Sequence, residues 1–144
     1  MNKFHLIFLA GLLLQCTHTG HRVPAPEDLY TEEGLAVIST YFNTTTQTTG
    51  ILFGNSAACK AAAGGYAHHN TGEDYRLVTW SQHGNPLWFG GHINGSIISI
   101  EQITSVQTGD AVSLRYRMAQ GKNTDIPQEQ RIAQIFSLKP LVFP

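Results

Sequence analysis

Residues 111–118, Ala-Val-Ser-Leu-Arg-Tyr-Arg-Met, determine how the rest of the chain is interpreted. Large apolar side chains occupy every second position, and serine or arginine stands between them. Because successive side chains of a strand point to opposite faces of a sheet, this alternation predicts a strand with one buried and one wet face. Strands of that kind are typical of antiparallel sheets, so the stretch predicts a mainly β protein.

Similar stretches lie on both sides of this strand, separated by turn residues. Residues 35–42 and 48–53 are rich in β-branched and aromatic residues and flank a polar segment, which predicts a hairpin. The dipeptide Asn94-Gly95 is the strongest hairpin-turn signal in the chain. Further strands are expected over residues 75–81, 87–93, 96–106 and 131–138.

One segment breaks this pattern. Residues 57–63 are rich in alanine, follow Asn55-Ser56 and end at Gly64-Gly65, which predicts a short helix with an N-cap and a glycine stop. An open sheet of seven or eight strands would expose an apolar face. We therefore expect a small antiparallel β-barrel or β-sandwich of seven to eight strands with one short Ala-rich helix.

The N-terminus has the pattern of an export signal. Lys3 precedes a nine-residue apolar run, which is too short to span a membrane and ends close to Cys16. The pattern resembles a bacterial lipoprotein signal, in which cleavage precedes a cysteine that becomes lipidated. An ordinary cleaved secretory signal and an uncleaved anchor are the alternatives.

This interpretation divides the chain into three parts. Residues 1–15 form the signal segment, and residues 16–33 comprise the lipid-acceptor Cys16 and a flexible tether that contains two prolines. Residues 34–144 form a single β-rich domain. If Cys16 is acylated or removed, Cys59 has no partner, and we expect no disulfide within the chain.

Charged residues make up only 13% of the chain, and the formal net charge is −1. No basic run is present. Charge alone therefore does not favour binding to nucleic acid or to an anionic membrane surface, and we expect no nucleic-acid partner.

Four histidines, His68, His69, His83 and His92, are the candidate metal ligands. Imidazole commonly binds zinc and copper, and these residues could converge at one end of a barrel. The chain lacks the closely spaced ligand pairs that make zinc motifs specific. Exposed loop histidines are the alternative, and we expect no bound cofactor.

Cys59 is the candidate nucleophile. It lies in the first turn of the predicted helix, where a thiol pKa is lowered, and a nearby histidine could act as a base. No cysteine-hydrolase motif surrounds it. A small buried residue on an Ala-rich helix is the alternative.

Aromatic residues form the third candidate site. Stacking of sugars on Tyr66, Trp80 and Trp88 would make a ligand platform, to which Tyr75 and Phe89 could contribute. The alternative places them in the core, with Trp80 and Trp88 as cross-strand partners of one hairpin.

These features together predict an exported, lipid-anchored protein of the cell envelope, at the outer membrane or the periplasmic face, or a secreted one. Its β domain would bind a ligand, a glycan or an envelope protein. One variant is an inhibitor or immunity-type protein that blocks an extracytoplasmic enzyme. The other classes are a metal-binding or hydrolytic protein that uses His and Cys59, and a purely structural surface component.

Overall fold

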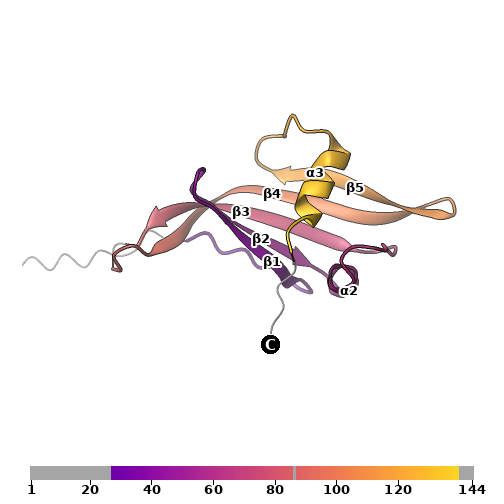
Figure 1. Ribbon diagram of the computed structural model, residues 1–144, viewed down its shortest axis with the longest axis horizontal. Coiled ribbons are helices and arrows are strands. Elements are labelled where there is room, and N and C mark those ends of the chain that lie inside the picture. The colour runs from indigo at the N-terminus through magenta and orange to yellow at the C-terminus, as the bar shows by residue number, and fades with distance from the viewer. Residues whose placement is uncertain (1–26, 86, 140–144) are drawn as a thin grey trace, which may run out of the picture.

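The computed structural model describes residues 27–85 and 87–139. Five antiparallel strands form one sheet in sequence order, each beside the strand that precedes it (Figure 1). The elements are β1 (Ala36–Asn43), β2 (Thr48–Gly54), α2 (Ser56–Ala63), β3 (Asp74–Gly84), β4 (His92–Thr108), β5 (Ala111–Gln120) and α3 (Gln128–Phe136). The predicted signal segment, Cys16 and the tether up to residue 26 lie outside the described residues.

The prediction of a mainly β protein is confirmed, but the predicted barrel or sandwich of seven to eight strands is wrong. The described residues form five strands, and the sheet is not closed. Closure is unnecessary because α3 lies across one face of the sheet (Figure 1) and buries Ile132 and Ile135. These two side chains join Leu52, Tyr75 and Ile103 in the core.

The helix α3 replaces the last predicted strand, over residues 131–138. Ile132 and Ile135 are three positions apart, which places them on one face of a helix. Pro127 precedes the first turn, where its missing N–H costs no hydrogen bond. A short apolar run of this kind fits a strand and a helix equally well, and the contact with the sheet decides between them. The sequence predicts one helix, but the described residues form two, because residues 128–136 are helical as well.

The turn predicted at Asn94-Gly95 and the strand predicted over residues 87–93 are also wrong. β4 runs straight through Asn94, which pairs with Gln82 of β3. Gly95 is required by close packing rather than by a turn, because a Cβ there would lie 2.3 Å from Nε2 of His83. The β3–β4 register shifts beside this position, and a glycine inside a strand often marks such an irregularity.

The Ala-rich helix is confirmed as α2. The Asn55 side chain accepts a hydrogen bond from the Ala58 amide at 2.9 Å and so caps the helix. Ala58 and Ala62 are buried against the core. The other predicted strands agree with β1, β2, β3, β5 and the later part of β4.

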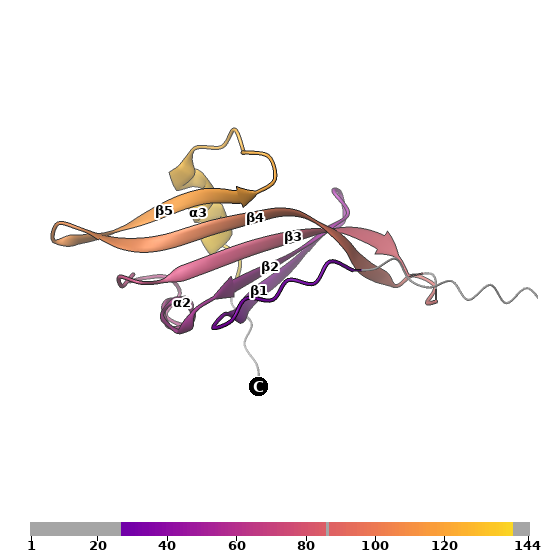
Figure 2. The same cartoon turned by 180° about the vertical axis from the view of Figure 1, so that it is seen from behind.

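The face of the sheet opposite α3 is crossed by residues 27–35 (Figure 2). The Trp80 indole N–H donates to the Asp28 carbonyl oxygen at 2.8 Å, and the Ile97 amide donates to the Asp28 carboxylate at 2.9 Å. Tyr30 packs against Phe53, with ring centroids 5.3 Å apart. This segment includes residues 27–33, which the sequence assigns to the tether.

Candidate functional site

The β3–β4 hairpin projects beyond the rest of the sheet (Figure 1). β2 pairs with β3 only as far as Ser81, and β5 pairs with β4 only from Ile100. Beyond these points β3 and β4 pair with each other, as Gly84 does with His92. The hairpin therefore presents its turn at one end of the molecule.

The turn of this hairpin exposes three consecutive large apolar side chains. Leu87 is 70% exposed, Trp88 74% and Phe89 104%. A single exposed hydrophobic residue is ordinary, but three in a row on a projecting turn form an apolar contact surface. We call Asn85 and residues 87–91 the hairpin tip.

Hydrogen bonds within the turn hold the hairpin tip in shape. The Asn85 amide donates to the Gly91 carbonyl at 2.8 Å, and the Gly91 amide donates to the Trp88 carbonyl at 3.0 Å. The Asn85 side chain accepts from the Leu87 amide at 2.9 Å. The apolar side chains thus stand on a turn that its own hydrogen bonds close.

The hairpin carries almost no charge. Residues 77–100 contain no Asp, Glu, Lys or Arg. His83 and His92 are the titratable side chains of this stretch. Phe42 extends the apolar character toward β1, because its half-exposed ring meets His92 edge-on at 5.8 Å between centroids. The turn of the hairpin therefore offers a contact surface that contains no charged side chain.

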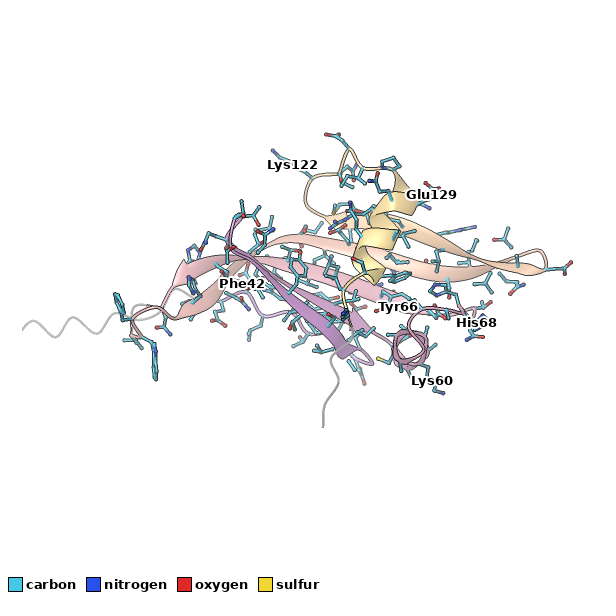
Figure 3. The ribbon with its side chains drawn as sticks, viewed as in Figure 1. Phe42, Lys60, Tyr66, His68, Lys122 and Glu129 are labelled. Carbon is cyan, nitrogen blue, oxygen red and sulfur yellow. The ribbon has the colours of Figure 1, made fainter. Side chains whose placement is uncertain are left out.

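The four candidate metal ligands lie in two pairs near opposite ends of β3. His68 and His69 precede the strand, and His83 and His92 lie near its other end. The two ends of an eleven-residue strand are about 30 Å apart. Figure 3 shows His68 near α2, far from Phe42, which contacts His92. Among the described residues no three His, Cys, Asp or Glu side chains form a group that could hold a metal, so the predicted set is not brought together.

Cys59 is not paired with a histidine. Its thiol donates to the Gly54 carbonyl at 3.5 Å, and it packs against the core. Burial raises the pKa of the Cys59 thiol. A raised pKa keeps the thiol protonated and so less nucleophilic. These contacts fit the structural alternative for Cys59.

A buried carboxylate, Glu73, organises the loop before β3, and the sequence analysis did not identify it. Glu73 accepts hydrogen bonds from His69 Nδ1 at 2.7 Å, from the Asn70 amide at 2.5 Å and from the Tyr75 hydroxyl at 2.9 Å. The His69 ring also stacks on Phe136 at 5.3 Å between centroids. A His–carboxylate pair can serve catalysis when it faces a nucleophile. Here its partners are loop and core residues, and the pair fixes the loop.

A second buried carboxylate, Glu101, fastens α3 to the sheet. The Arg131 guanidinium donates two hydrogen bonds to it, at 2.7 and 2.6 Å, and the Tyr116 hydroxyl donates a third at 2.8 Å. The carboxylate raises the pKa of Arg131 through these hydrogen bonds. Arg131 lines an open cavity of about 230 Å³ between β1 and α3, but its charge is already matched by Glu101.

The three candidates for an aromatic platform are not brought together. Trp80 is only 4% exposed and pairs with Ile97, so its predicted cross-strand pairing with Trp88 is wrong. The Tyr66 ring stacks on Phe136 at 4.5 Å between centroids, and it lies near α3 (Figure 3). Trp88 alone of the three is open to solvent.

No protein-family model matches the chain, and no curated protein matches its sequence. No helix among the described residues is long and apolar enough to cross a membrane. The exposed apolar side chains of the hairpin tip make it the candidate site with the clearest chemistry.

Proposed function

We propose that the chain is an exported, lipid-anchored protein of the cell envelope whose β domain is not an enzyme and binds an envelope component through the hairpin tip. The observation that carries the proposal is the row of exposed side chains at Leu87, Trp88 and Phe89. Burying apolar surface gains about 25 cal/mol per Å². A partner that covers this row would gain that free energy.

The reactive side chains of the domain support a binding role rather than catalysis. Glu73 and Glu101 each have their partners inside the protein. Cys59 is hydrogen-bonded to the backbone of β2 and its pKa is raised. These groups stabilise the fold, which leaves the uncharged tip as the contact surface.

Export and anchoring are supported by the sequence before the described residues. The apolar run that ends near Cys16 is typical of a lipoprotein signal. A contiguous exposed apolar surface marks a site that contacts a membrane or another protein, and an envelope protein lies beside both.

An inhibitor or immunity-type protein is the second candidate. A projecting, ordered and apolar turn suits insertion into the cleft of an extracytoplasmic enzyme. In that case the same three side chains would fill an apolar pocket of the enzyme.

Mass spectrometry of the mature N-terminus tests export and anchoring. We expect a mature chain that begins at an acylated Cys16 and sediments with membranes. The variant Cys16→Ala should lose the acyl group. A full-length chain with Met1 intact in the cytosol would overturn the proposal.

Photo-cross-linking in cells tests the contact surface. A photoreactive amino acid at position 88 should form a cross-link to an envelope component. The same amino acid at position 110, in the exposed turn between β4 and β5, is the matched control and should form far less. Equal labelling at the two positions would remove the hairpin tip as the contact surface.

A further inference from the structure

We infer that the envelope component at the hairpin tip is the lipid bilayer, and that Leu87, Trp88 and Phe89 insert into its interfacial region. This inference rests on the proposed function, because it names the partner of the same surface.

The first observation is the direction of the N-terminal segment. Glu32 contacts Arg76 near the start of β3, whereas Asp28 contacts Trp80 and Gly95 much farther along the hairpin. Followed back toward the N-terminus, the chain therefore runs toward the tip (Figure 2). Gly95, which Asp28 contacts, is four residues from Gly91 of the hairpin tip. This separation corresponds to about 13 Å along the chain.

Glu27, the first described residue, lies toward the end of the domain that carries the hairpin tip, so the predicted anchor at Cys16 joins the domain at that end. The chain between Cys16 and Glu27 can span at most about 40 Å when fully extended. An acylated Cys16 would therefore hold this end of the domain, rather than the β4–β5 turn, close to the membrane.

The second observation is the chemistry of the tip. Tryptophan favours the membrane interface, because it joins a large apolar ring to one N–H group. A charged side chain becomes costly where it enters the hydrocarbon of the bilayer, and residues 77–100 contain no Asp, Glu, Lys or Arg. Insertion driven by apolar area needs no anionic lipid, so it should depend little on salt.

The third observation is that the turn satisfies its own backbone. Unpaired amides are costly where lipid excludes water. Four tip amides donate within the turn: Asn85 to Gly91, Leu87 to the Asn85 side chain, Trp88 to Asn85, and Gly91 to Trp88. The turn can thus enter the interface with fewer bare polar groups than an irregular loop would carry.

Insertion would set the orientation of the domain. The long axis of the molecule is horizontal in Figure 1, and the hairpin tip lies at one end of it. With the tip in the membrane, the sheet stands upright and the β4–β5 turn points away from the bilayer.

Fluorescence quenching tests the inference on the mature chain isolated from membranes and reconstituted into phosphatidylcholine vesicles. Lipids brominated in the acyl chain quench tryptophan that enters the bilayer. We expect strong quenching and a blue shift for the wild type, and loss of both in Trp88→Phe. The remaining Trp80 is buried, and its indole N–H donates a hydrogen bond to Asp28, so its fluorescence should not respond to insertion of the tip.

A second variant keeps the reporter and weakens insertion. Phe89→Ser should reduce the quenching of Trp88. In a chain that begins at Thr17, and so carries neither the signal segment nor a lipid, the same substitution should lower the affinity for vesicles roughly tenfold or more. Val37→Ser, on β1, is the control because it removes an exposed apolar side chain away from the tip. Quenching that is equal in the wild type and Trp88→Phe would overturn the inference.

The outcomes separate this inference from the proposed function. A cross-link from position 88 to a protein, with Trp88 unquenched by brominated lipid, would overturn bilayer insertion and leave the proposed function standing. Quenching of Trp88 in added vesicles by a chain that begins at Thr17 would support insertion even if the lipid anchor were disproved.

Discussion

At the scale of single residues, two buried carboxylates show how this sparsely charged chain uses its charges. Glu73 is 1% exposed and Glu101 is 3% exposed. Each accepts three hydrogen bonds from side chains or backbone amides. A buried carboxylate without such partners would be strongly destabilising. Both residues therefore act as fixed points to which loops and α3 are attached.

The variant Glu73→Gln should lower the free energy of unfolding by about 2 to 4 kcal/mol. The amide of glutamine offers one acceptor oxygen, whereas His69, the Asn70 amide and Tyr75 all direct toward the carboxylate. Urea unfolding followed by circular dichroism measures the change. Glu33→Gln, at an exposed position before β1, is the control and should change stability by less than about 0.5 kcal/mol. Equal effects of the two variants would contradict this account of Glu73.

The variant Tyr66→Phe should leave stability unchanged or raise it by about 1 kcal/mol. The buried Tyr66 hydroxyl has no hydrogen-bond partner within the described part of the chain, while the ring that stacks on Phe136 is kept. Tyr75→Phe is the matched comparison, because its hydroxyl donates to Glu73. In thermal unfolding, Tyr75→Phe should have a lower midpoint temperature than Tyr66→Phe. The reverse order would be inconsistent with these contacts.

At the scale of elements, α3 takes the place of the strands that a closed barrel would need. It covers one face of the sheet with Ile132 and Ile135 and is fastened by the Arg131–Glu101 pair. Arg131 and Glu101 are thirty residues apart in the sequence. The position of α3 therefore depends on a contact between distant parts of the chain.

The variant Arg131→Met should lower the free energy of unfolding by about 3 kcal/mol or more, because it leaves the Glu101 carboxylate buried without its cation. The double variant Glu101→Gln, Arg131→Met removes the charge as well, and Tyr116 can still donate to the new carbonyl. We expect the double variant to recover a large part of the loss. A double-mutant cycle in urea measures the coupling, and additive effects would mean that the pair does not fasten α3.

The elements differ in how far the sequence predicts them, for physical reasons. β5 alternates in exposure from Leu114 to Ala119 and α2 has a local cap at Asn55, so local patterns suffice for both. α3 and the long β4 depend on remote contacts, such as Gly95 against His83. Their local patterns are therefore ambiguous, and the predicted strand and turn fail there.

The candidate site is predictable only in part. Trp80 and Trp88 look equivalent in the sequence, and only the β3–β4 register separates them, since it buries Trp80 opposite Ile97 and leaves Trp88 in the turn. The absence of charge over residues 77–100 is visible in the sequence and could have marked the hairpin. No pattern in the sequence indicates which residues bond to Glu73 and Glu101.

At the scale of the whole molecule, the two faces of one open sheet are covered by different means. The helix α3 covers one face, and residues 27–35 cross the other (Figures 1 and 2). The hairpin tip extends past both coverings, which leaves its apolar side chains without cover from the rest of the domain. The buried Tyr75 and the half-buried Tyr66 and Tyr116 contact α3 or the Glu101 carboxylate that fastens it, so the stability of the whole domain should depend on their protonation.

The free energy of unfolding should therefore fall at alkaline pH, over the pH range in which these tyrosines lose their protons. Burial raises the pKa of Tyr66 to about 12, and burial together with Glu101 raises the pKa of Tyr116 to about 12. Burial and Glu73 also raise the pKa of Tyr75. Because the folded-state values exceed the ordinary 10.0, this stabilisation is complete below pH 10 and is lost as the pH rises toward about 12. Urea midpoints measured up to pH 12 should decline over this range, and less steeply in Tyr66→Phe. A flat profile, with phenolate absorbance appearing near pH 10 in the folded protein, would show that these hydroxyls are not buried.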